Sequence, residues 1–168
     1  MDNLWAPWRG KYISKIVKKN SGEVFSRIAR EKNDRKNFVF VRTRYCYAVL
    51  NIYPYNNGHS LVVPLRKVKD LSLLTPAEKA DLYALLEYTK ELLDEVLRPQ
   101  GYNIGINLGR TAGAGFPQHL HIHIVPRWLG DANFMPITAH TKVISQSMQE
   151  LYDRLVKAHQ RRTLKKKK

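Results

Sequence analysis

The sequence predicts an α+β domain with an antiparallel sheet of about five strands, one long helix and a C-terminal helix. Runs rich in β-branched and aromatic residues fall into two groups, three runs before a long helical pattern and two after it. Strands and helices therefore do not alternate along the chain, and this order excludes a doubly wound parallel sheet.

The first half of the chain predicts a short helix followed by three strands. Val24, Phe25 and Ile28 fall on one helical face of the segment 23–31. Three β-rich runs bounded by Asn, Pro and Gly then predict antiparallel strands over 37–41, 45–53 and 59–64.

The long helix has clear start and stop signals. Thr75 suits the N-cap, Pro76 the first turn and Glu78 the capping box. We expect the helix to end at about Leu97, before Pro99. Its apolar face consists of Leu82, Leu85, Leu86, Leu92, Leu93 and Val96.

The second half predicts a strand, a glycine-rich loop, a strand ended by Pro126 and a final helix, over 101–109, 109–118, 119–126 and 143–159. The chain thus divides into an N-terminal arm, a main domain, a C-terminal helix and a solvated basic tail, over 1–22, 23–140, 141–160 and 161–168. Trp5, Trp8 and Tyr12 indicate that the arm docks, either on the chain's own core or across a subunit interface.

Composition limits the class of protein. The 168 residues are 43% hydrophobic and 26% charged, which fits one packed domain and excludes wholesale disorder. The net charge of +15 favours an anionic partner. A single cysteine, Cys46, excludes an internal disulfide framework. The chain has no signal-peptide pattern and no apolar run of membrane length, so we expect a cytoplasmic protein without membrane contact.

Three histidines alternate with apolar residues near the end of the predicted sheet. Residues i, i+2 and i+4 of a strand share one face, so His119, His121 and His123 are expected side by side, about 6.6 Å apart. Leu120 and Ile122 then enter the core with their neighbour Ile124. Packing alone poorly explains three imidazoles on one face directly after a glycine-rich loop.

Two chemistries remain open for this cluster. Adjacent strand histidines can share a zinc ion, but the outer two are about 13 Å apart and cannot both bind it. Alternatively, a neutral imidazole attacks phosphorus while its neighbours act as acid and base. The preceding loop offers backbone N–H groups to an anion.

HLHIHIV is identified as the His-φ-His-φ-His-φ-φ signature of the histidine triad (HIT) family. NGHSLVVP and NLGRTAGAG resemble other blocks of that family, and LWAPWRGKYI and VPRWLGDANF resemble its bacterial branch of diadenosine tetraphosphate (Ap4A) phosphorylases. The resemblance implies a homodimeric nucleotidyl hydrolase or transferase that needs no cofactor. It would cleave a nucleoside polyphosphate, with adenine as the expected base, at the α-phosphate through a covalent nucleotidyl-histidine. Water and phosphate both remain open as the acceptor.

The resemblance also implies roles for the histidines. His121 would be the nucleophile, and His123 would contact phosphate oxygens and assist the leaving group. His119 would lie at the rim and help to hold His121 through the local backbone. His59 matches a fourth histidine that supports the triad by hydrogen bonding.

Further positions match the nucleotide-binding residues of the family. Asn51 matches the residue that binds the ribose hydroxyls, and Asn107 a polar residue on the phosphate side. Gly115 and Phe116 replace a Ser or Gln of many relatives, so backbone N–H groups would have to bind phosphate there. Trp128 matches a residue that helps to select the substrate, although it could equally be a packing anchor. The implied base pocket, which could also be plain core, comprises Val24, Phe25, Ile28, Leu50, Ile52 and Leu61.

The sequence departs from the family in one potential zinc site. Many bacterial relatives carry Cys-x-x-Cys where this chain has Glu23 and Ser26, and those cysteines bind zinc together with histidines that match His59 and His119. Loss of both thiolates removes most of the zinc affinity. We therefore predict no metal.

Two functions without catalysis are alternatives. The positive charge and the terminal KKKK would suit a nucleic-acid-binding module, although no RNA-binding aromatic signature is present. A nucleotide sensor that lacks turnover would also need the pocket, but it would leave His121 without a role.

Overall fold

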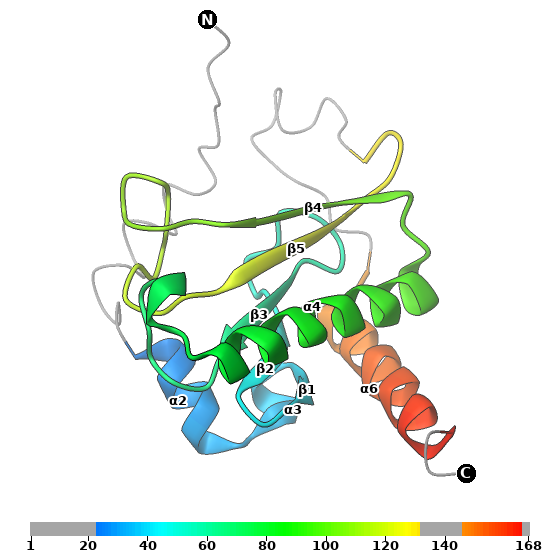
Figure 1. Ribbon diagram of the computed structural model, residues 1–168. Coiled ribbons are helices and arrows are strands. Elements are labelled where there is room, and N and C mark those ends of the chain that lie inside the picture. Colours follow the sequence, from blue (N-terminus) through cyan, green and yellow to red (C-terminus); the bar gives the residue numbers. More distant parts are fainter. Residues whose placement is uncertain (1–22, 132–145, 166–168) are drawn as a thin grey trace, which may run out of the picture.

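A computed structural model describes residues 23–131 and 146–165 of the chain (Figure 1). The predicted N-terminal arm and most of 130–140 lie outside these residues. The elements, in chain order, are α2 Val24–Glu31, α3 Asp34–Asn37, β1 Val39–Arg42, β2 Cys46–Leu50, β3 Ser60–Pro64, the 3-10 helix η1 Leu71–Leu73, α4 Pro76–Leu97, β4 Gly101–Ile106, β5 Ile122–Arg127 and α6 Met148–Lys165.

The sheet confirms the predicted α+β class. Its five strands are all antiparallel to their neighbours and lie in the order β1-β2-β3-β5-β4. Figure 1 shows α4 crossing one side of the sheet, with α6 beside it. Among the described strands, β1 and β4 are therefore the edges, and β3 and β5 are neighbours near the centre.

Helix α4 begins and ends as predicted. The Thr75 hydroxyl accepts the Glu78 N–H at 3.2 Å, and the Glu78 carboxylate accepts the Thr75 N–H at 2.8 Å, which completes a capping box. Arg98 then adopts the left-handed conformation at the C-cap, one residue before Pro99.

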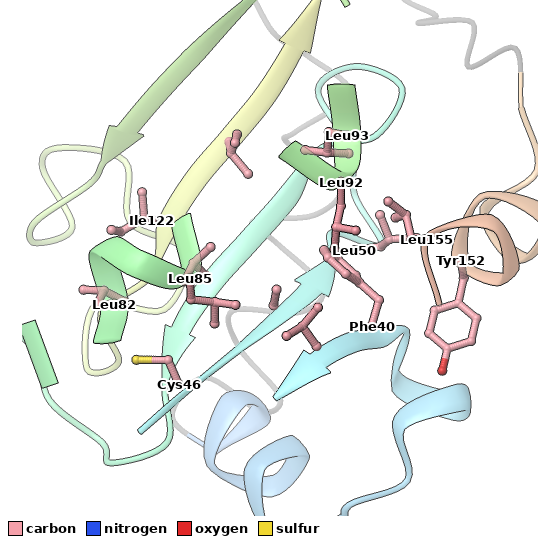
Figure 2. Packing of buried hydrophobic residues seen from close by; sticks show 14 of the residues in the cluster. Phe40, Cys46, Leu50, Leu82, Leu85, Leu92, Leu93, Ile122, Tyr152 and Leu155 are labelled. Carbon is pink, nitrogen blue, oxygen red and sulfur yellow. The ribbon is translucent and has the colours of Figure 1, made fainter. Parts of the chain in front are cut away.

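Apolar side chains pack against both faces of the sheet. One cluster joins the sheet to α4 and α6 (Figure 2), and a smaller cluster joins it to α2. All five residues of β2 are buried, and alternate residues serve opposite faces. Cys46, Ala48 and Leu50 face α4 and α6, whereas Tyr47 and Val49 face α2.

Strand β5 differs from the predicted strand at both ends. It starts at Ile122 rather than His119. It also continues through Pro126, where we expected it to stop, to Arg127. β3 pairs with β5 only as far as Ile124, so the missing N–H of Pro126 costs no ladder hydrogen bond with β3.

Helix α6 is displaced along the chain from the predicted 143–159, and it includes the first residues of the predicted basic tail. Arg161 and Arg162 both form ion pairs with Glu95 of α4, and Arg162 also pairs with Glu91. These contacts hold the last turns of α6 against α4, so these two arginines are not part of a solvated tail. Within the described residues, no helix combines the length and hydropathy that a membrane span requires.

The turn between β2 and β3 approaches α4 closely at Gly58. This glycine has φ 75°, and a Cβ atom there would press into the side chain of Leu97. We expect Gly58→Ala to lower the free energy of unfolding by about 1–3 kcal/mol in urea denaturation. Gly113→Ala is the matched control, because Gly113 has φ 87° but open space around it. Equal losses in both variants would contradict a steric role for the contact with Leu97.

Candidate active site

The sheet register brings the histidines of two strands together. His59 directly precedes β3, and Leu61 of β3 pairs with His123 of β5. The rings of His59 and His123 are 5.1 Å apart, and those of His121 and His123 are 4.9 Å apart. Four imidazoles therefore lie along adjacent chain segments, with Leu120, Ile122 and Ile124 buried on the α4 side as predicted.

His121 is a neutral imidazole with one unprotonated ring nitrogen. Its Nδ1 lies 2.8 Å from the carbonyl oxygen of His119, which can only accept, so Nδ1 carries the proton. Burial lowers the pKa of His121, although the bond to the His119 carbonyl opposes this shift. The Nε2 of the neutral ring therefore has a free lone pair, which is the form that attacks an electrophile.

His123 receives its orientation from His59. The backbone N–H of Tyr55 donates to Nδ1 of His59 at 3.0 Å, so a neutral His59 carries its proton on Nε2. That Nε2 lies 2.9 Å from Nδ1 of His123 and donates to it. The proton of a neutral His123 is then on its own Nε2, from which it can be donated in a hydrogen bond.

The side chain of His119 is buried beside the other histidines and is not exposed at the rim of the site. The side chain is buried, and its Nε2 donates to the carbonyl oxygen of Pro64 at 2.8 Å. Its Nδ1 lies 3.3 Å from the hydroxyl of Ser26. Burial is the main cause of its lowered pKa. The carbonyl of His119 contacts His121, which is the contact expected if His119 holds His121 through the backbone.

Helix α2 covers the histidine face through Phe25. The Phe25 ring lies 5.0 Å from the ring of His121, 5.6 Å from that of His119 and 5.2 Å from that of Phe116. The hydroxyl of Tyr47 donates to the carbonyl of Phe25 at 3.0 Å and ties α2 to β2. This apolar cover causes the desolvation that keeps His121 neutral.

The structure brings together most, but not all, of the residues expected in the base pocket. Phe25, Ile28 and Leu61 share the cluster beside the histidines, and Val24 and Phe116 pack against it. Leu50 belongs to the opposite face, among the residues that contact α4 and α6. Ile52 is 57% exposed in the turn after β2.

The structure places Leu50 on the opposite face of the sheet from the expected base pocket, and the strand register explains why. Val49, not Leu50, pairs with Leu61 across the β2–β3 ladder, and residues in register share a face. The pocket side of β2 therefore consists of Tyr47 and Val49, two residues that we did not predict. The alternation of β2 was visible in the sequence, but its register with β3 was not.

The polar residues expected at the nucleotide are placed as follows. The amide nitrogen of Asn51 lies 3.3 Å from Nδ1 of His59, and its amide oxygen accepts the N–H of Tyr53. Asn107 and Gly115 are half-buried at either end of the glycine-rich loop. Trp128 is half-buried just after β5, and its N–H donates to Asp131.

Tyr55 is a residue of this site that sequence reasoning missed. Its ring stacks on His123 at 5.6 Å with 16° between the planes, and it lies 4.4 Å from the ring of His59. A tyrosine in an irregular turn belongs to no helical or strand period, and only its position four residues before His59 could have drawn attention to it.

A metal ion does not fit the donor groups beside His119. Ser26 offers a hydroxyl where a thiolate would be needed, and His59 is already hydrogen-bonded to His123. Within the described ranges, no three His, Cys, Asp or Glu side chains are grouped as metal ligands. The absence of zinc remains a prediction.

A cavity of about 460 Å³ adjoins the glycine-rich loop. Lys69 and Arg110 bring positive charge to it, and Asp70 brings a carboxylate that accepts two hydrogen bonds from Ser72. The lining residues are Lys69, Asp70, Leu108, Gly109, Arg110, Pro117 and Gln118. Its net positive charge suits an anion close to the segment that leads into the triad.

Known proteins are similar to this chain over most of its length. The family model described as HIT domain matches residues 32–128. An AP-4-A phosphorylase of Mycobacterium tuberculosis (strain ATCC 25618 / H37Rv) is 40% identical over 157 residues, which cover 89% of this chain and 80% of that protein. An asymmetrical bis(5'-nucleosyl)-tetraphosphatase of Schizosaccharomyces pombe is 40% identical over 93 residues, covering 55% of this chain and 50% of that protein.

Solved structures share the fold. A Zn-bound histidine triad family protein from Mycobacterium smegmatis has a TM-score of 0.66 and 26% identity, covering 83% of this chain and 94% of that one. A hypothetical histidine triad nucleotide-binding protein from Sulfolobus tokodaii also has a TM-score of 0.66, at 22% identity, covering 82% of this chain and 91% of that one.

The lowered pKa values of His119 and His121 predict that acid weakens the fold. Below about pH 6.5 these histidines bind protons in the unfolded chain, whereas in the folded protein their lowered pKa values keep them unprotonated. The free energy of unfolding therefore falls as the pH falls from about 6.5 to the lowered values. We expect the double variant His119→Gln, His121→Gln to lose less stability than the wild type between about pH 7.5 and about pH 5.5 in urea titrations.

His159 provides the matched control for this measurement. Burial also lowers its pKa, but it lies on α6 beside Tyr88, away from the triad. His159→Gln should remove its own share of the pH dependence and leave the share of the triad. An unchanged pH dependence in the double variant would contradict the burial of neutral imidazoles in the site.

Proposed function

The chain belongs to the HIT domain family and is an enzyme, and we propose that it cleaves dinucleoside polyphosphates such as Ap4A at the α-phosphate through a covalent nucleotidyl-histidine. The observation that carries this proposal is the hydrogen bond from Nδ1 of His121 to the His119 carbonyl. It leaves Nε2 as a nucleophile in a ring that burial keeps neutral.

In the first step, Nε2 of His121 attacks the α-phosphorus and forms an N–P bond. The bond from that phosphorus to the bridging oxygen of the departing polyphosphate breaks, and the oxygen takes its electron pair. The Nε2–H of His123 donates a hydrogen bond to that oxygen and stabilises its developing negative charge, and the polyphosphate leaves as an anion. The positive charge of the phosphorylated imidazole is stabilised at Nδ1–H by the His119 carbonyl, which already accepts this proton.

In the second step, an acceptor oxygen attacks the same phosphorus and the N–P bond returns its electron pair to Nε2 of His121. Phosphate attacks through an ionised oxygen and needs no base, whereas an attacking water releases its proton to the solvent. Inorganic phosphate as acceptor gives a nucleoside diphosphate, and water gives a monophosphate. The similarity to an AP-4-A phosphorylase over 89% of the chain supports phosphate as the acceptor.

Substrate contacts complete the proposal. We assign the base to the cluster under α2 formed by Phe25, Ile28 and Leu61, together with Val49. Asn51 would bind the ribose, and Asn107 with the backbone of Gly115 and Phe116 would bind phosphate. The positive charge of Lys69 and Arg110 beside the loop supports a polyphosphate as the remaining part of the substrate.

The covalent step is tested by mass spectrometry after brief mixing with Ap4A, with and without inorganic phosphate. We expect an added nucleotidyl group on wild-type His121 and none in His121→Asn, with kcat/KM reduced at least about 1,000-fold in the variant. Products that form only with phosphate identify a phosphorylase, and products without phosphate a hydrolase. Binding of Ap4A without adduct or turnover would contradict the proposal and leave a nucleotide sensor.

A homodimer through β4 is also part of the proposal. Among the described strands, β4 is an edge of the sheet, and it exposes Ile104 to 48%. An edge strand with an apolar side chain is a template for pairing with another strand, here a second copy that would extend the sheet. The second copy would cover backbone groups that β4 leaves unpaired on its outer side.

Ile104→Lys tests the dimer by sedimentation equilibrium. We expect the wild type to sediment as a dimer and the variant to dissociate, because a buried lysine without a counterion opposes association. Leu164→Lys is the control, since Leu164 is 67% exposed on α6, away from β4. A monomeric wild type, or dissociation of both variants alike, would contradict an interface at β4.

A further inference from the structure

A chain of contacts behind the histidines remains unexplained by the proposed chemistry. It starts at Asp131, in the VPRWLGDANF segment that follows β5. The Asp131 side chain is only 7% exposed, and its carboxylate accepts Nε and a terminal nitrogen of Arg127 at 2.6 and 2.9 Å. It also accepts the backbone N–H of Trp128 at 3.0 Å. A buried carboxylate with this many donors is rigidly placed.

The same carboxylate holds the turn that carries His59. The buried amide of Asn56 donates from Nδ2 to Asp131 at 2.7 Å and to the carbonyl of Pro126 at 3.0 Å. The carbonyl of Asn56 accepts the N–H of His59 at 3.1 Å. Asn56 thus links the end of β5 to the start of β3.

Tyr55 lies next to this link, and its backbone N–H helps to determine which ring nitrogen of His59 carries the proton. Its backbone N–H donates to Nδ1 of His59, and its ring stacks on His123. Were the proton of His59 on Nδ1, its Nε2 would have to accept from His123. The proton of His123 would then be on Nδ1, and its Nε2 would have no proton to donate to a leaving group. The N–H of Tyr55, together with the amide nitrogen of Asn51 at 3.3 Å from the same atom of His59, therefore determines whether His123 can donate a hydrogen bond from Nε2.

We propose that Asp131 is a positioning residue for His123, acting through Asn56 and through the backbone N–H of Tyr55. The inference rests on the proposed role of His123 as the hydrogen-bond donor to the leaving group. Asp131 and Asn56 hold the β2–β3 turn so that this N–H meets Nδ1 of His59. His59 then donates to His123, and the proton of His123 remains on the nitrogen that faces the leaving group.

The test compares Asn56→Ala and Asp131→Asn with the wild type. Asn56→Ala removes the link itself, and Asp131→Asn keeps the shape but removes the charge that holds it. Asn103→Ala is the matched control, because Asn103 contacts Arg127 on its other side and leaves the link between Asn56 and Asp131 intact. Thermal unfolding confirms that each variant is folded before it is assayed.

The first readout is the tautomer of His59 and His123, measured by two-bond ¹H–¹⁵N correlation in protein with ¹⁵N-labelled histidine. We expect both rings protonated on Nε2 in the wild type and in Asn103→Ala. Asn56→Ala and Asp131→Asn should populate the Nδ1-protonated form of His59. Unchanged tautomers in both variants would overturn the inference, and this readout needs no turnover.

The second readout is the dependence of kcat on the leaving group. Phenolate keeps its negative charge on the oxygen and depends on the hydrogen bond from His123, whereas p-nitrophenolate spreads its charge into the nitro group. We expect kcat for the phenyl ester of AMP to fall about 10- to 100-fold in Asn56→Ala, and kcat for the p-nitrophenyl ester of AMP to fall less than about 3-fold. KM should change little for either substrate.

A purely structural role gives a different pattern. Equal losses for the two substrates, or the same losses in Asn103→Ala, would overturn the inference. If the wild type cleaves neither the two esters nor Ap4A, the proposed function fails, and the tautomers still decide whether Asp131 and Asn56 orient His59 and His123.

Discussion

The antiparallel pairing of β3 with β5 is the contact on which the candidate site depends. His59 and His123 are 64 residues apart in sequence, and their ring nitrogens approach to 2.9 Å because Leu61 pairs with His123. A slip of one residue would turn the imidazoles of β5 toward α4 and turn Ile122 and Ile124 away from the core. Since that core is buried, the register that maximises apolar burial is also the one that assembles the site.

Main-chain groups give chemically identical side chains different properties. The carbonyl of His119 holds a proton on Nδ1 of His121, whereas the carbonyl of Pro64 holds one on Nε2 of His119. At His59 the main-chain partner is a donor. The N–H of Tyr55 donates to Nδ1, so the proton of a neutral His59 is on Nε2. In the proposed mechanism, a nucleophile with an unprotonated Nε2 and a hydrogen-bond donor with a protonated Nε2 thus have ring centres 4.9 Å apart. Burial beneath Phe25 of α2 lowers the pKa of His121 and favours its neutral form.

The sequence was most informative where a period or a local signal was enough. The alternation around His121 predicted which side chains share a face, and the capping box at Thr75 predicted the start of α4. Prediction failed where two distant segments had to be aligned. Leu50 was expected beside the base because the register of β2 against β3 was not known. Arg161 and Arg162 were expected in a tail beyond the last helix, because their ion-pair partners lie on another helix.

The route from Asp131 to His123 avoids placing a charge beside the histidines. A carboxylate bonded directly to His59 would stabilise the imidazolium, raise its pKa and remove its ability to accept the N–H of Tyr55. Asn56, a neutral amide, and the N–H of Tyr55 transmit the position of Asp131 without its charge. The charge is neutralised instead by Arg127 at the end of β5. In the proposed mechanism, the site thereby combines a rigidly held hydrogen bond between His59 and His123 with the low polarity around the nucleophile His121.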